Sequence, residues 1–451
     1  MDHNRMNAAL RDATDTHHLR IGTGTLNEVG NVLEQAFGQQ PVVVVADDNT
    51  YAAAGKAVYD RLRSAGWMVE EPIVFPGTPT LYASFENVLT LEEKLRPTSA
   101  VPIAVGSGTL NDITKLAAYR AGRRYMCIGT AASVDGYTAF GAAITKDDFK
   151  QTIMCPAPRA LVADLDVLIN APAQMKSAGY GDLFGKVTAG ADWILADALE
   201  VELIDKNAWS LVQDSLRDWT GQPQALYTGD RQAIENLFEG LIMSGVAMQI
   251  YHSSRTASGS EHQFSHTWEM QALAHDHAPV PHGFKVGVGS IAVAALYELV
   301  LARDLTKLDI DALCHAWPSP EEVEREVEQS HSIPKLAENA VQQSLTKYIT
   351  PDQLRQRLLL IQERWPTIRG RLEHQLMTAE QMRDMLRAAG CPTEPAEVGV
   401  TVAQLRETYT LARTIRSRYT VLDLVNEVGI LDACVDTLFA PGGYWASITH
   451  A

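Results

Sequence analysis

The chain has 451 residues, of which 46% are hydrophobic and 21% are charged, a balance that is ordinary for a globular protein. Because this length exceeds the size at which one hydrophobic core usually stops growing, we expect two domains. The formal net charge of −17 argues against general affinity for nucleic acid or for an anionic membrane, since both need a surplus of Lys and Arg.

The first third of the chain alternates short β-branched runs with helical segments. Strands separated by helices of ten or more residues indicate a parallel sheet with right-handed crossovers. We therefore predict a nucleotide-binding α/β domain over residues 1–169. Its expected elements are a strand at 41–50, a helix at 51–66, a strand near 71–77, a strand, glycine turn and helix at 99–122, a strand at 124–133 and a closing strand segment at 160–175.

Helical periodicity dominates beyond residue 170, and no strand-rich segment is evident after residue 180. We predict an all-α domain over residues 170–451 that binds a metal and the substrate, with a cleft between the two domains as the default binding site. The most apolar long stretch, at 286–302, contains Glu298 and two glycines, so it predicts a buried helix and no membrane span.

Cysteine usage and the N-terminus bear on the compartment. The five cysteines are scattered, their number is odd and no CxxC motif is present, which fits reduced thiols better than a disulfide framework. The first 20 residues have no apolar core, so they predict no secretory signal. We expect a cytoplasmic protein.

A glycine turn follows the expected strand near residue 100, in the segment "AVGSGTLND". Gly106 and Gly108 allow a tight turn and the approach of a diphosphate to the N-terminus of a helix, although two glycines in such a turn are also common for packing reasons. The third glycine of GxGxxG is missing. Thr109 with Asp112 matches a capping-box variant. Asp47 ends a strand, where it suits either a ribose hydroxyl of NAD or a plain helix cap.

Histidines cluster strongly between residues 252 and 282, where six of the 13 in the chain lie. His262 and His266 are four residues apart in "SGSEHQFSHTWEM", so a helix would place them on one side. Two imidazoles with one carboxylate make a metal site that keeps an open position. Asp182 could supply the carboxylate or act as a helix cap. His275 and His277 we expect to be surface residues of a polar loop.

Six segments, in this order and spacing, resemble the iron-containing alcohol dehydrogenase and dehydroquinate synthase-like superfamily, and most closely its sn-glycerol-1-phosphate dehydrogenases of the AraM type. The resemblance covers nearly the whole chain, and residues 301–350 are the hardest part to match. The segments are "GSGTLNDITK", "GTAASVDGYTAFGAAI", "GYGDLFGK", "SGSEHQFSH", "HGFKVGVGS" and the tail from Gly390 to Leu424.

The resemblance implies a role for each matching residue. It implies one divalent metal, commonly zinc, nickel or iron, on Asp182, His262 and His282, with His266 facing the substrate and Asp182 and His266 as the catalytic pair. It also implies substrate contacts at Asp135 and Asp182. The cofactor, NAD or NADP, would lie on Asp47, Gly106, Ser107, Gly108, Thr109, Leu110, Asp112, Thr130 and Ser133. Ala139 stands where relatives often carry a cofactor-contacting Ser, which puts one minor hydrogen bond in doubt.

The activity that the resemblance implies is the reversible reduction of dihydroxyacetone phosphate to sn-glycerol 1-phosphate by a homodimer or larger homo-oligomer. A glycerol dehydrogenase, or another polyol or polyol-phosphate dehydrogenase, stays open, because Lys186, Arg255 and Lys285 could bind phosphate or be mere surface charges. A dehydroquinate synthase-like cyclase usually has Glu at position 182. A non-catalytic nucleotide-binding relative would have lost a metal ligand, whereas all three are present.

Overall fold

The computed structural model describes residues 3–146, 149–274 and 280–448, and its chain forms two compact units. The sheet unit comprises residues 1–183 and 207–254, and the helical unit comprises residues 184–206 and 255–451. These limits differ from the predicted boundary between residues 169 and 170. The physical reason is that the helix over 231–251 packs on the sheet unit: the Phe238 ring lies 5.5 Å from that of Tyr137, in the 3-10 turn Asp135–Tyr137.

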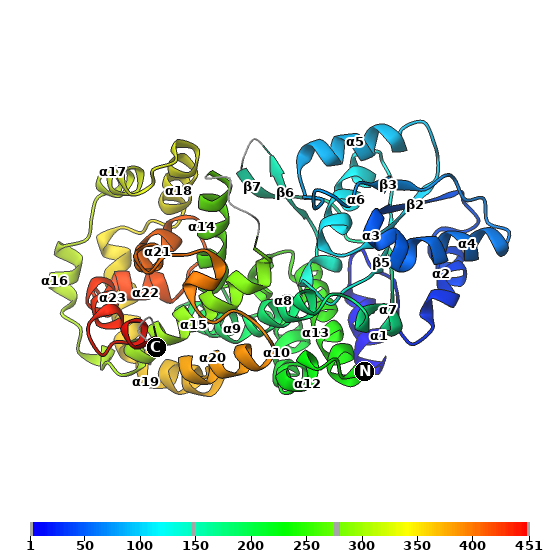
Figure 1. Cartoon of the computed structure of the whole chain (residues 1–451). Coiled ribbons are helices and arrows are strands. Elements are labelled where there is room, and N and C mark those ends of the chain that lie inside the picture. The colour runs from blue at the N-terminus through cyan, green and yellow to red at the C-terminus, as the bar shows by residue number, and fades with distance from the viewer. Residues whose placement is uncertain (1–2, 147–148, 275–279, 449–451) are drawn as a thin grey trace. The chain divides into compact units, whose positions relative to one another are not determined.

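Six parallel strands form one sheet, as predicted for the N-terminal region (Figure 1). Their order is β1-β8-β5-β4-β2-β3. The first strand, β1, pairs with β8 and was not among the predicted strands. The bounds are β1 (His18–Gly22), β2 (Val42–Asp47), β3 (Ile73–Phe75), β4 (Val101–Gly106), β5 (Met126–Gly129) and β8 (Ala160–Asp164); a separate antiparallel pair joins β6 (Ala142–Lys146) to β7 (Phe149–Ile153).

Helices cover both faces of this sheet. In β2, Val42, Val44 and Ala46 pack toward α2 and α4, whereas Val43 and Val45 pack toward α5 and α6. Burial on both faces explains why this strand is a continuous apolar run. The helices of the unit are α1 (His3–Asp12), α2 (Val29–Phe37), α3 (Asp48–Thr50), α4 (Lys56–Ser64), α5 (Phe85–Leu95), α6 (Gly108–Arg120), α7 (Leu165–Ile169), α8 (Ala173–Phe184), α10 (Lys206–Gln213), α11 (Leu216–Thr220), α12 (Pro223–Tyr227) and α13 (Arg231–Tyr251).

The strand order reverses between β2 and β4. From β2 the chain goes outward to β3 on one side and then returns to place β4 on the other side. In parallel α/β sheets, ligands bind outside the carboxyl ends of the strands at such a reversal. Asp47, at the end of β2, and the Gly106–Gly108 turn, at the end of β4, therefore lie at the point where a nucleotide site is expected.

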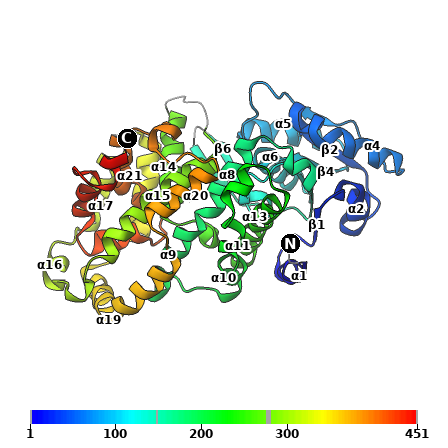
Figure 2. The same cartoon turned by 60° about the horizontal axis from the view of Figure 1, so that its bottom comes forward.

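The helical unit is all-α in its described residues, as predicted, and is built around α15 (Figure 2). This helix is long and apolar enough to cross a membrane, but 83% of its most apolar window is buried inside the structure, as in a core helix. The helices are α9 (Lys186–Ala198), α14 (Ser260–Ala274), α15 (His282–Leu301), α16 (Ile310–His315), α17 (Pro320–Ser330), α18 (Pro334–Thr346), α19 (Pro351–Gln375), α20 (Ala379–Ala388), α21 (Val402–Thr414), α22 (Val421–Glu427), α23 (Leu431–Phe439) and α24 (Tyr444–Ile448).

Candidate metal centre

Three imidazole rings from α14 and α15 gather in the helical unit. The ring of His262 lies 5.3 Å from that of His282, centroid to centroid, and the ring of His266 stacks at 5.6 Å on that of His282. Gly289 makes this approach feasible, because a Cβ atom there would lie 2.7 Å from the carbonyl oxygen of Glu261. The residues predicted from the i, i+4 spacing are thus joined by the first residue of the next helix.

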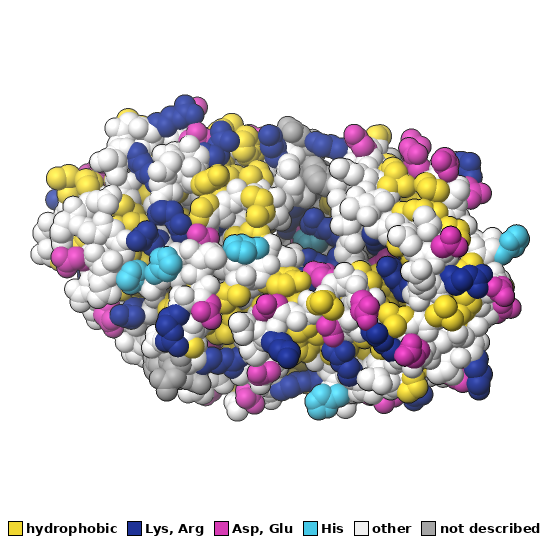
Figure 3. All heavy atoms as spheres, turned by 180° about the vertical axis from the view of Figure 1, so that it is seen from behind, with side chains coloured by type: hydrophobic (Ala, Val, Ile, Leu, Met, Phe, Trp, Pro, Cys, Tyr) yellow, Lys and Arg dark blue, Asp and Glu magenta, His cyan; other side chains and the backbone are white. Residues whose placement is uncertain are grey.

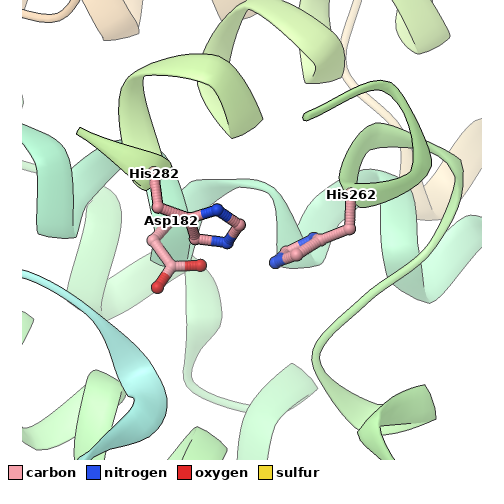
Figure 4. A group of neighbouring side chains, drawn as sticks. All are labelled: Asp182, His262 and His282. Carbon is pink, nitrogen blue, oxygen red and sulfur yellow. The ribbon is translucent and has the colours of Figure 1, made fainter. Parts of the chain in front are cut away.

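Asp182 completes a set of metal-ligating atoms. Its side chain is fully buried, and one carboxylate oxygen accepts a 2.9 Å hydrogen bond from the backbone N–H of Asp135. Ligand atoms of Asp182, His262 and His282 lie within 4.8 Å of one another, and the three side chains point toward a common centre (Figure 4). One carboxylate and two imidazoles are a donor set that zinc, nickel and iron accept.

Each of the two histidines of this set, His262 and His282, contacts a buried carboxylate through its Nδ1 atom. Nδ1 of His262 lies 2.7 Å from Glu261, and Nδ1 of His282 lies 2.8 Å from Glu269. An ionised carboxylate only accepts hydrogen bonds, so each Nδ1 carries the proton and each Nε2 keeps its lone pair. Carboxylates often fix metal-binding histidines in this way.

Glu261 is an ionised, fully buried side chain. Burial acts to raise its pKa, but the His262 ring and the Gly259 amide lower it, and the net result is a pKa below the ordinary value. The Gly259 N–H donates to one carboxylate oxygen at 2.7 Å and the Thr188 hydroxyl to the other at 3.1 Å. These contacts fix the carboxylate that orients His262.

The start of α14 is anchored by Asp192 of α9, a second fully buried carboxylate. Its Oδ2 accepts from both the N–H and the hydroxyl of Ser260 at 2.7 Å, and its Oδ1 accepts from the Tyr297 hydroxyl at 2.6 Å and the Val421 N–H at 2.8 Å. Gly259 is required beside it, since a Cβ atom would lie 2.6 Å from Oδ2. Asp192 therefore anchors the chain at Ser260, two residues before His262.

His266 lies on the same side of α14 and is partly exposed. Its Nδ1 is 3.3 Å from Glu269, and burial lowers the pKa of its ring to about 3 although Glu269 acts to raise it. The ring is neutral at physiological pH. His266 is also a neighbour of His282 in a second group of potential ligands, His266, Glu269 and His282.

Asp135, predicted to contact substrate, is buried in the sheet unit. Its Oδ2 accepts from the Ser244 hydroxyl of α13 at 2.9 Å, while its backbone N–H donates to Asp182. The loop that carries it is held by the buried Lys115 of α6, whose ammonium donates to the carbonyls of Gly136, Ala139 and Gly141 at 2.9 to 3.0 Å. Ala139, the departure from the family pattern, is buried in this loop.

The glycine turn after β4 has a packing reason of its own. A Cβ atom at Gly106 would lie 2.5 Å from the Leu110 side chain, and one at Gly108 would lie 2.8 Å from Val134. The Leu110 side chain is buried in the core beneath the turn, so a cofactor contact at this residue would fall to its backbone. Thr130 follows β5 and donates its N–H to the Gly106 carbonyl at 3.1 Å, which places the Thr130–Ser133 segment beside the turn.

Of the two helix caps expected from the sequence, one is absent and the other is present. The capping box between Thr109 and Asp112 is wrong, because α6 already begins at Gly108 with Ser107 as its N-cap; Asp112 instead accepts from Lys115 and from the Ala143 N–H. At α3, Asp47 and Thr50 do form a capping box, with the Thr50 N–H 2.8 Å from the Asp47 carboxylate. The plain cap reading of Asp47 therefore applies, whether or not a ribose also binds there.

The three basic residues of the motifs are buried and are not surface charges. Lys186 and Arg255 are fully buried, and Lys285 lies 3.2 Å from Glu269. His275 and His277 lie outside the described residues. The carboxylates Glu261 and Glu269 were missed by the sequence analysis; the only signal was that Glu269 stands three residues after His266, on the same helix face.

The sequence and the fold of this chain are both similar to those of known dehydrogenases. The family described as iron-containing alcohol dehydrogenase matches residues 20–172. The chain is 32% identical to a glycerol-1-phosphate dehydrogenase (NAD(P)+) of Bacillus velezensis, over 94% of this chain and 95% of that protein. It is 38% identical to one of Halalkalibacterium halodurans, over 62% and 70%. The crystal structure of glycerol dehydrogenase from Schizosaccharomyces pombe shares the fold, with a TM-score of 0.60 at 17% identity over 97% of this chain and 92% of that one.

Proposed function

The chain belongs to the iron-containing alcohol dehydrogenase family, in the group of the glycerol-1-phosphate dehydrogenases, and we propose that it reduces dihydroxyacetone phosphate reversibly to sn-glycerol 1-phosphate with NAD(P)H. The observation that carries the proposal is the convergence of Asp182, His262 and His282 in a chain of that family. Their donor atoms fit one divalent ion, and we propose zinc, nickel or iron.

A bound ion would supply a Lewis acid that polarises the ketone oxygen and stabilises the negative charge developing on it, and the nicotinamide would supply or take up the hydride. The residues of the chain prepare this site. Asp182 is held by the Asp135 N–H, and His262 and His282 would each present Nε2. These second contacts fix the ligand geometry before substrate binds.

We assign His266 to the substrate hydroxyl. Its ring is neutral because burial lowers its pKa to about 3. Its Nδ1 is 3.3 Å from the Glu269 carboxylate and donates to it, so Nε2 is left to accept a hydrogen bond. In the oxidation direction the proton of the substrate hydroxyl would pass through Nε2 of His266 to water, and in the reduction direction water would return a proton to the ketone oxygen by the same route. Asp135 would accept from a second hydroxyl of the substrate, with Ser244 fixing its carboxylate.

The nucleotide would lie along the carboxyl edge of the sheet. The backbone of the Gly106–Leu110 turn and the N-terminus of α6 suit a pyrophosphate, and the Thr130–Ser133 segment lies beside that turn. Asp47 would accept from a ribose 2′-hydroxyl and repel a 2′-phosphate, so we propose a preference for NAD over NADP. We also propose that the protein is cytoplasmic and forms a homodimer or a larger homo-oligomer. Light scattering of the purified protein tests the oligomeric state.

The experiment that tests the function is NADH oxidation by the purified, metal-reconstituted protein, with dihydroxyacetone phosphate and dihydroxyacetone compared side by side. We expect a large preference in kcat/KM for the phosphate ester. Turnover of dihydroxyacetone alone would move the assignment to a glycerol-type dehydrogenase. No turnover of either, with metal bound, would contradict the proposed substrate.

A further inference from the structure

Glu269 lies at a junction of three cationic or potentially cationic side chains in the helical unit. Its Oε1 is 2.8 Å from Nδ1 of His282 and 3.2 Å from Nζ of Lys285. Its Oε2 is 3.3 Å from Nδ1 of His266. The carboxylate is buried, with 5% of the residue exposed. One side chain therefore contacts both the proposed ligand His282 and the proposed substrate contact His266.

Helical periodicity explains why these residues meet. His266 and Glu269 are three residues apart on α14, and His282 and Lys285 are three residues apart in the first turn of α15, so each helix presents a pair on one face. The Gly289 contact lets the two helices approach closely enough for the pairs to interlock. The juxtaposition belongs to the packing of α14 on α15 and lies wholly within the helical unit.

The chemistry of the junction sets the tautomers of two rings at once. A carboxylate paired with an ammonium is ionised and offers no proton, so Nδ1 of both His282 and His266 must donate. Both rings then expose Nε2 as a lone pair, one suited to a metal and the other to a substrate hydroxyl. Losing the carboxylate would leave both tautomers free to invert.

We propose that Glu269 is a positioning residue that couples the metal ligand His282 to the substrate contact His266, with Lys285 balancing its charge. The inference rests on the proposed function, in that it assumes a divalent ion on Asp182, His262 and His282. It adds a residue outside that ligand set on which both metal affinity and substrate binding depend.

A different reading would place a second metal on His266, Glu269 and His282, whose ligand atoms also lie close together. Two observations argue against it. The Glu269 oxygens are already at hydrogen-bond distance from both Nδ1 atoms, and the Lys285 ammonium lies 3.2 Å from Oε1, where it would repel a cation. The junction therefore suits a charge-balanced hydrogen-bond network.

The test compares Glu269→Gln with Glu427→Gln, a matched control. Glu427 is equally buried in the same unit and accepts from Arg357 and Tyr419, with no histidine among these contacts. The amide of Gln has one acceptor oxygen and one N–H₂ donor, so it cannot satisfy two Nδ1–H groups and an ammonium. We expect the dissociation constant for Zn²⁺, measured by chelator competition on the metal-free protein, to rise about 10–100-fold in Glu269→Gln and to stay unchanged in Glu427→Gln.

A second measurement separates positioning from general damage. At saturating Zn²⁺, Glu269→Gln should raise KM for dihydroxyacetone phosphate through the released His266, and Glu269→Asp, which keeps the carboxylate, should recover part of the metal affinity. Wild-type Zn²⁺ affinity in Glu269→Gln, or equal loss in Glu427→Gln, would overturn the inference alone. A wild-type protein that binds no divalent metal would overturn the metal site and this inference together.

Discussion

His262 and His266 have the same residue type and lie one helical turn apart, but they differ in their neighbours, which supports the different roles that we propose for them. His262 is nearly fully buried with Glu261 behind it, whereas His266 is partly exposed and shares Glu269 with His282. At the scale of the residue, a carboxylate partner on Nδ1 leaves Nε2 of each ring as an acceptor, and of the two rings it is that of His262 that groups with Asp182 and His282. Spacing in the sequence places both rings on one side but does not show that partner.

We predict that Asp182→Asn removes metal binding and activity together. The amide is a poor ligand for the proposed ions, and its N–H₂ group would replace either the oxygen that faces the ion or the oxygen that accepts from the Asp135 N–H. We expect metal content after dialysis to fall to near zero and kcat to drop by at least about 10³-fold, since the Lewis acid is lost. The control is Asp197→Asn on α9, whose carboxylate binds Arg371 and the Ile204 N–H. Full metal content and activity in Asp182→Asn would contradict the ligand assignment.

Sequence alone could predict the candidate residues of the centre but not what holds them. The resemblance pointed to Asp182, His262 and His282, which the fold brings together. Glu261 and Glu269 were missed, because a buried carboxylate behind a histidine looks in sequence like any solvated Glu on a helix. The sequence pattern predicts a capping role for Asp112, whereas its carboxylate accepts from Lys115, because a polar side chain in the first helical turn can take either role.

At the scale of the element, the glycines of α15 matter as much as its apolar residues. Strand and helix patterns predicted the parallel sheet and this buried helix, because continuous apolar runs report burial on all sides. They did not predict β1, whose five residues "HLRIG" are too short and too polar to stand out, or the contact at Gly289. A glycine that admits a neighbouring backbone depends on where that neighbour lies, which local sequence does not contain.

We predict that Gly289→Ala weakens metal binding by moving α15 away from α14. The new Cβ atom would lie 2.7 Å from the Glu261 carbonyl oxygen and 3.2 Å from the Phe264 Cβ atom, and because the nearer atom is backbone the helix itself must shift. We expect a loss of about 1–3 kcal/mol in the free energy of unfolding and a weaker Zn²⁺ affinity, measured by urea titration and chelator competition.

Gly370→Ala is the control for that substitution. Gly370 is an exposed residue inside α19 with no atom within 4 Å of an added Cβ atom. The same change there should stabilise the protein by about 0.5–1 kcal/mol, through helix propensity alone, and leave Zn²⁺ affinity as it was. Equal behaviour of the two variants would show that Gly289 is not a packing glycine.

At the scale of the whole molecule, the net charge of −17 is carried by a mixed surface. Acidic and basic side chains are interspersed over the face drawn in Figure 3. The interiors of both units also contain charge, as Lys115 in the sheet unit and Arg255 in the helical unit illustrate. The predicted boundary was placed where the strands end, whereas α8 and α13 also belong to the sheet unit. A unit made of two separate stretches of chain depends on contacts between residues distant in sequence, which local patterns do not contain.

Buried charge gives the stability of the protein a pH dependence, and Glu427 of α22 is the clearest case. Burial raises its pKa to about 7 from an ordinary 4.5, although Arg357 at 2.5 Å and the Tyr419 hydroxyl at 2.7 Å act to lower it. Between these two pH values the folded state binds a proton that the unfolded chain releases. The stabilising contribution is therefore complete below pH 4.5 and is lost as the pH rises through 7.

We predict that Glu427→Gln, which cannot titrate, flattens this part of the stability profile. From pH 5 to pH 8 the free energy of unfolding of the wild type should fall relative to that of the variant by up to about 3 kcal/mol, whatever constant offset the loss of the Arg357 pair adds. Urea titrations of both proteins at pH 5, 6, 7 and 8 measure the difference. Parallel profiles would mean that Glu427 stays ionised throughout, so that its pairing with Arg357 outweighs its burial.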